Sequence, residues 1–82
     1  MTLDEALNEM TELIKGVAPD AVLKTTKRSA DEMTIRAYVP AATEDAVREA
    51  TQARSVELLV SNQLDVQVLI YDIETSLAPE DR

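Results

Sequence analysis

The chain has 82 residues, a net charge of −8, and neither histidine nor cysteine. It therefore lacks the commonest metal ligands, a thiol nucleophile and a proton shuttle that titrates near neutral pH. Acidic residues outnumber basic ones by 16 to 8, which opposes binding to nucleic-acid backbones and anionic membranes and favours solubility or a basic partner.

The N-terminal segment predicts an amphipathic helix over residues 3–15. Thr2 and Glu5 have the spacing of a capping box, and Gly16 is placed to form a left-handed C-terminal cap. Apolar residues recur at spacings of three and four, which line one helix face. They are Leu3, Ala6, Leu7, Met10, Leu13, Ile14 and Val17.

Two strands follow, over residues 21–28 and 33–39, and their spacing suggests a hairpin. In the second strand apolar and polar residues alternate from Met33 to Val39, the period of a half-buried strand. The first strand has a polar end, but its β-branched residues favour the same assignment.

A second helix is predicted after Pro40, with Thr43 at its start and Asn62 as a left-handed cap at its end. Its expected outer side contains Glu44, Arg48, Glu49, Gln52 and Arg54. Its expected core-facing stripe consists of Ala46, Val47, Ala50, Ala53, Val56, Leu59 and Val60.

A third strand is predicted over residues 64–73, where Leu64, Val66 and Val68 alternate with more polar positions. Residues 1–74 are expected to form a single domain and residues 75–82 a disordered tail. The order is therefore α-β-β-α-β. We predict an α+β two-layer sandwich with two helices on one face of a three-stranded sheet. A mixed sheet, with the third strand beside the second, is preferred over an antiparallel one.

Two helices on one side leave the other sheet face open, and alternation indicates which side chains lie there. We expect both tyrosines, one leucine and several cations to gather on it, a composition that is enriched in protein interfaces. An ordinary solvated sheet face explains the same residues. The candidate partner-binding residues are Lys24, Arg28, Arg36, Tyr38, Leu69 and Tyr71.

The order of elements resembles two families of small domains. Iron–sulfur scaffold domains of the NifU C-terminal type have a CxxC pair before the second helix, where this chain has residues 39–44 without a thiol. Type II KH-like domains have a GxxG loop that holds a nucleotide backbone, but residues 44–61 contain no glycine. The resemblance concerns layout over residues 2–73, and neither binding motif is present.

These observations predict a non-enzymatic, cytoplasmic domain that binds a protein partner or a second copy of itself. No catalytic residues, metal or cofactor are expected, because the acid–base and ligand groups for such sites are missing. Asp72 and Glu74 share a predicted strand face, but two carboxylates are too few for a calcium site. No segment has the length and hydropathy of a membrane span. Two alternatives stay open: weak RNA or single-strand binding by the open face, and small-molecule sensing in a pocket near Ala46, Ala50 and Ala53.

Overall fold

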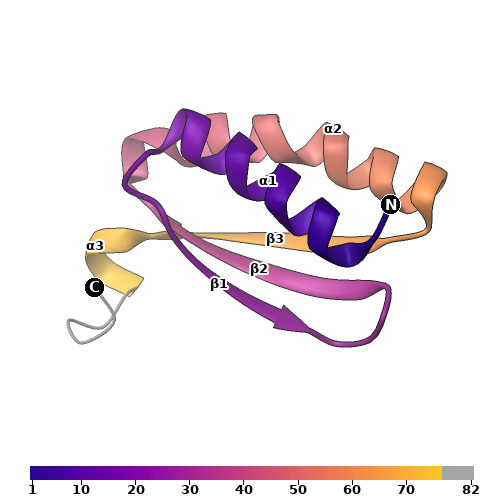
Figure 1. The fold of residues 1–82 in the computed structure, drawn as a ribbon. Helices are drawn as coiled ribbons and strands as arrows, with labels where there is room; N and C mark the ends of the chain where they lie inside the picture. Colours follow the sequence, from indigo (N-terminus) through magenta and orange to yellow (C-terminus); the bar gives the residue numbers. More distant parts are fainter. Residues whose placement is uncertain (77–82) are drawn as a thin grey trace.

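The computed structural model describes residues 1–76 and has the predicted order of elements (Figure 1). The elements are α1 (Leu3–Val17), β1 (Val22–Lys27), β2 (Glu32–Val39), the 3-10 turn η1 (Ala41–Thr43), α2 (Glu44–Asn62), β3 (Asp65–Asp72) and α3 (Ile73–Ser76).

The three strands form one mixed sheet in the order β1-β2-β3, as predicted. β1 pairs with β2 in the antiparallel sense, and β3 pairs with β2 in the parallel sense. The register places Lys24 opposite Arg36 and Arg36 opposite Leu69, while Tyr38 lies opposite Tyr71. β1 and β3 are consequently the two edges of the sheet.

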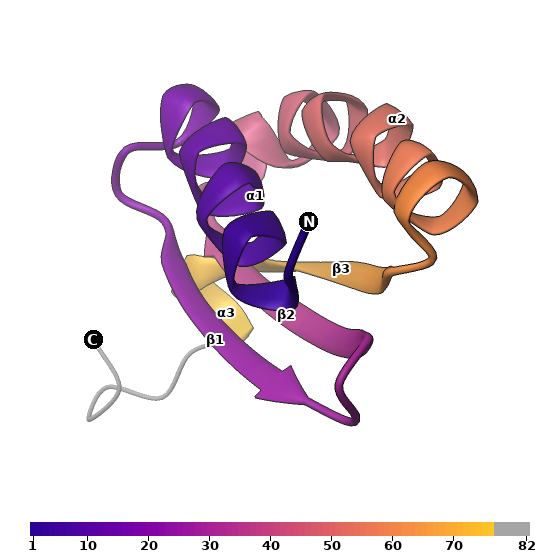
Figure 2. The ribbon, with the colours of Figure 1, turned by 45° about the vertical axis from the view of Figure 1, so that its right-hand side comes forward.

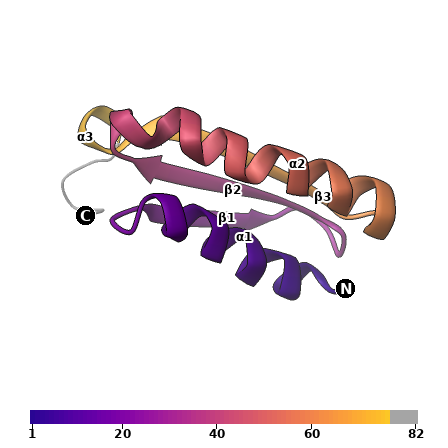
Figure 3. The same cartoon turned by 90° about the horizontal axis from the view of Figure 1, so that it is seen from above.

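α1 and α2 lie side by side on one face of the sheet, α1 toward β1 and α2 toward β3 (Figures 1 and 3). The core lies between the helices and the sheet, and the predicted stripe of α1 faces it. Met10 and Ile14 of α1 and Met33 and Ile35 of β2 are completely buried. The prediction for α1 and β2 is therefore confirmed, including the capping box, in which Thr2 and Glu5 exchange hydrogen bonds of 3.2 and 2.9 Å.

The predicted inner face of α2 is right at Val47, which is buried, and wrong for most of its other residues. Val47, Thr51 and Leu58 face the core, whereas Val56, Leu59 and Val60 are 56%, 54% and 73% exposed. Burial of Thr51 is tolerated because its hydroxyl donates a 2.9 Å hydrogen bond to the carbonyl of Val47. The helix thus has apolar side chains on two sides, and only the less apolar side contacts the sheet.

Helix ends also differ from the predictions. Gly16 lies within α1, so it is not a left-handed cap, and α1 ends at Val17. Gln63, with φ of 57°, takes the left-handed position after α2 that was assigned to Asn62. The side chain of Thr43 caps no backbone group of α2 and instead donates to the carbonyl of Pro40 at 2.7 Å.

β3 ends one residue earlier than predicted because α3 begins at Ile73. Asp72 starts this short helix by accepting a 2.9 Å hydrogen bond from the Glu74 amide, so the two carboxylates do not share a strand face. α3 lies below the sheet, on the side away from α1 and α2 (Figure 2). Thr75 and Ser76, predicted as the start of a disordered tail, belong to α3, and the rest of that tail, residues 77–82, lies outside the described residues.

Candidate protein-interaction surface

The side of the sheet that faces away from α1 and α2 is the candidate site, and we call it the open face. Its side chains come from alternate residues of each strand, whose neighbours point into the core. The open face consists of Val22, Lys24, Thr26, Glu32, Thr34, Arg36, Tyr38, Asp65, Gln67, Leu69 and Tyr71. The strand register therefore brings five of the six predicted site residues onto one surface, with Arg28 directly after β1.

One end of the open face is built around the two tyrosines. Their rings stack with centroids 5.3 Å apart and an interplanar angle of 23°. The ammonium group of Lys24 lies 5.9 Å from the centroid of the Tyr38 ring. Tyr38 is only 8% exposed and offers little of its ring to a partner. The sequence predicts Tyr38 as a partner-binding residue on an open face, and its burial corrects the expected accessibility.

The middle of the open face is more accessible. Lys24, Arg36 and Leu69 form one row across the three strands, since each lies opposite the next. Arg36 is exposed at the centre of the sheet, and Leu69 beside it is 41% exposed. The row therefore presents a guanidinium group next to an aliphatic side chain.

At the far end, a carboxylate partly neutralises Arg28. The Arg28 guanidinium lies 3.5 Å from the carboxylate of Asp65, and both side chains are about 40% exposed. An ion pair this exposed stabilises the fold weakly, but it opposes the charge of Arg28. Of the six predicted residues, Arg28, Arg36 and Leu69 are thus exposed, while Lys24 and Tyr71 are half-buried and each contacts the buried Tyr38.

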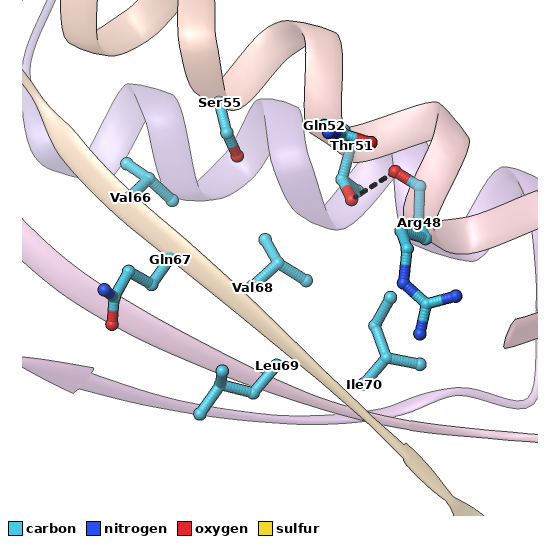
Figure 4. Close-up of a pocket in the computed structure, with 9 residues that line it drawn as sticks. All are labelled: Arg48, Thr51, Gln52, Ser55, Val66, Gln67, Val68, Leu69 and Ile70. Atoms are coloured by element: carbon cyan, nitrogen blue, oxygen red, sulfur yellow. Dashed lines mark hydrogen bonds between the residues drawn. The ribbon is translucent and has the colours of Figure 1, made fainter. Parts of the chain in front are cut away.

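A groove runs along the outer edge of β3, beneath α2, and has a volume of about 520 Å³ (Figure 4). It is lined by Arg48, Thr51, Gln52 and Ser55 from α2 and by residues 66–70 from β3. The expected pocket near the alanines is not this groove, because Ala46 and Ala53 are exposed and line none of it. The sequence contains one signal for the groove: at Leu69, β3 is apolar on both faces.

The groups with shifted pKa values belong to the helix layer. Hydrogen bonds from Arg54 lower the pKa of the Glu9 carboxyl, and the same pair raises the pKa of the Arg54 guanidinium. The hydrogen bonds of the capping box lower the pKa of Glu5. In each case hydrogen bonds of an ion pair or a helix cap stabilise the charged form of the group. Within residues 1–76, no group of three or more carboxylates is arranged to hold a metal ion.

Searches against protein-family models, curated proteins and solved structures find no significant match to this chain. None of the helices in the described part of the chain has the length and apolar character required to cross a membrane.

Proposed function

We propose that this chain is a non-enzymatic protein-binding domain that binds an acidic, partly apolar segment of its partner on the open face. The observation that carries the proposal is the row formed by Lys24, Arg36 and Leu69. It places two cations and an exposed leucine side by side on a sheet face that neither α1 nor α2 covers. The cytoplasm remains the expected compartment.

Charge supports an acidic partner segment. This support is local, because the net charge of the chain is −8 and α1 and α2 carry many of its carboxylates. On the open face Lys24 and Arg36, with Arg28 directly after β1, outnumber the carboxylates of Glu32 and Asp65. Arg36 can donate two parallel hydrogen bonds to one carboxylate, which gives geometry as well as charge. Leu69 supplies the neighbouring apolar contact. The stacked tyrosines hold one end of this surface in a fixed shape, which lowers the entropic cost of binding.

A defined peptide panel tests this proposal. Three versions of one peptide, with leucines separated by glutamate, by glutamine or by lysine, are titrated into isotopically labelled protein and followed by NMR. We expect the glutamate version to bind most tightly and to shift the amide signals of Lys24, Arg36 and Leu69. Binding should weaken as salt is raised, because the contact depends on charge.

Variants give the matched comparison. Arg36→Gln with Leu69→Ser should weaken binding of the glutamate peptide at least about tenfold, since one charged contact and one apolar contact are lost. Lys15→Gln with Val60→Ser also removes one cation and one exposed aliphatic side chain, but from the helix layer, and should leave binding unchanged.

Two outcomes contradict the proposal. The first is tightest binding of the lysine peptide, or amide shifts confined to α1 and α2. The second is that a single-stranded oligonucleotide binds the open face while the glutamate peptide does not, which would assign the face to nucleic acid.

A further inference from the structure

The two edges of the sheet differ in how they are protected against pairing. β1 contains Lys24 and Lys27, and lysines on an edge strand discourage another strand from adding to it. β3 has charges only at its ends, Asp65 and Asp72, and none between them. It is also the longer edge, with eight residues against six. β3 is therefore the unprotected edge of the sheet.

The residues that line the groove beside this edge include no acidic residue. Among its lining residues the only charged side chain is that of Arg48, which forms an ion pair of 2.9 Å with Asp45. We call the surface formed by these lining residues the strip. Because it has no carboxylates, the strip lacks the main obstacle to contact between two copies of a chain with a net charge of −8. The floor of the strip consists of Val66, Val68 and Ile70, and the latter two are only partly buried.

Exposed aliphatic side chains extend the strip. Leu59 follows Ser55 by four residues and Gln52 by seven, so it continues the side of α2 that lines the groove. Leu59 is 54% exposed and Leu69, at the other rim of the strip, is 41% exposed. An 82-residue chain without disulfides buries limited apolar surface on its own, so covering these residues would add stability.

We infer that two copies of this chain pair through β3 to form a continuous six-stranded sheet. A strand that pairs with its own copy about a two-fold axis must run antiparallel to it. If this axis is perpendicular to the sheet and passes beside Val68 or Leu69, the helices of both copies lie on the same side of the joined sheet. Alternate residues of β3 point their backbone N–H and C=O groups away from β2, and the second copy would satisfy them.

Side-chain pairing is compatible with both positions of the axis. With the axis at Val68, Val66 lies opposite the second copy's Ile70. With the axis at Leu69, Val68 lies opposite that Ile70. Pairs of β-branched residues are favourable across antiparallel strands. Neither register places Asp65 or Asp72 opposite a carboxylate, so the charged ends of β3 do not repel one another directly.

Analytical ultracentrifugation at several concentrations tests the inference. We expect a monomer–dimer equilibrium whose dissociation constant falls when NaCl is raised from about 20 mM to about 500 mM, because salt screens repulsion between two chains of net charge −8. This salt response is opposite to that expected for peptide binding on the open face, so the two proposals can fail separately. A chain that stays monomeric at every salt and protein concentration overturns the inference.

Charge placed in the strip provides a matched comparison. Gln52→Glu with Gln67→Glu adds two exposed carboxylates per copy beside the proposed axis and should raise the dissociation constant at least about tenfold. Asn8→Asp with Gly16→Glu adds the same charge to α1, where a side chain at Gly16 meets nothing within 4 Å. This control should change dimerisation much less, and equal effects of the two variants overturn the inference.

The absence of cysteine allows the contact to be located directly. Val68→Cys and Leu69→Cys each place one thiol at a possible axis position, where it meets its own copy. We expect one of them to form a disulfide-linked dimer under mild oxidation far faster than Asn8→Cys, whose thiol lies on α1. If neither forms a cross-link faster than the Asn8→Cys control, β3 is not the contact.

Discussion

The Glu9–Arg54 pair connects α1 to α2, and both side chains are partly exposed. Arg54 donates hydrogen bonds from Nε and Nη2 to the two carboxylate oxygens of Glu9, the second at 3.1 Å, and from Nη1 to Glu57 at 3.3 Å. The Arg54 side chain is 26% exposed, so its aliphatic part covers the gap between the helices. A charged residue therefore occupies a position that hydrophobicity alone assigns to the outside.

Glu9→Gln should lower the free energy of unfolding at neutral pH but not in acid. Hydrogen bonds from Arg54 lower the pKa of folded Glu9 below its usual 4.5, so the stabilisation is complete above 4.5 and is lost as pH falls through the folded pKa. Urea unfolding of both proteins between pH 7 and pH 3 should show the difference shrinking with acid. Glu12→Gln, also on α1, serves as the control, and a difference independent of pH contradicts the expectation.

Tyr38→Ala should destabilise the fold more than Tyr71→Ala. Tyr38 is 8% exposed in the central strand, and truncating a buried aromatic residue costs about 3 kcal/mol. Tyr71 is more exposed and lies on the edge strand, so its loss removes the stacking contact and less buried surface. Urea unfolding measures both values. Equal losses would show that the two rings are buried to the same extent in solution.

At the scale of elements, α2 shows why hydrophobic spacing can mislead. The stripe that contains Ala53, Val56 and Val60 is more apolar than the true inner side, which contains Thr51 and Arg54. Hydrogen bonds allow the less apolar side of α2 to face the core. The Thr51 hydroxyl donates to a carbonyl within the helix, and Arg54 donates to Glu9 on α1. Neither partner is visible in a count of apolar residues, so the helix could be predicted but its orientation could not.

Adjacent leucines in α2 should respond differently to truncation. Leu58 is completely buried and Leu59 is 54% exposed. Leu58→Ala should cost about 2–5 kcal/mol, whereas Leu59→Ala should stay within about 0.5 kcal/mol for the monomer. Urea unfolding at low protein concentration compares the two variants. A larger loss for Leu59→Ala would mean that the originally predicted stripe is the inner one after all.

For the whole molecule, the fold could be predicted because its elements have clear periods and short connections. Alternation in β2 and β3 defined which side of the sheet is uncovered, and the register then gathered the candidate residues. Accessibility within that face could not be predicted, since the burial of Tyr38 depends on tertiary contacts, among them those with Lys24 and Tyr71 from neighbouring strands. The groove beside β3 likewise depends on how α2 lies over the sheet.

The free energy of unfolding should rise with ionic strength. The folded chain concentrates a net charge of −8 in a small volume, and salt screens this repulsion more than it weakens the few exposed ion pairs. Urea unfolding in low and high KCl, at a protein concentration where the chain is monomeric, measures the change. Lower stability at high salt would mean that attractive pairs outweigh the net repulsion.

The central place of β2 also implies an order of events during folding. β1 and β2 are joined by the short turn at residues 28–31 and can associate early, because closing so small a loop costs little entropy. β3 reaches β2 only after the chain has passed through α2, so the parallel pair joins contacts distant in sequence. Substitutions in the hairpin should therefore slow refolding, whereas those in the middle of β3 should chiefly accelerate unfolding.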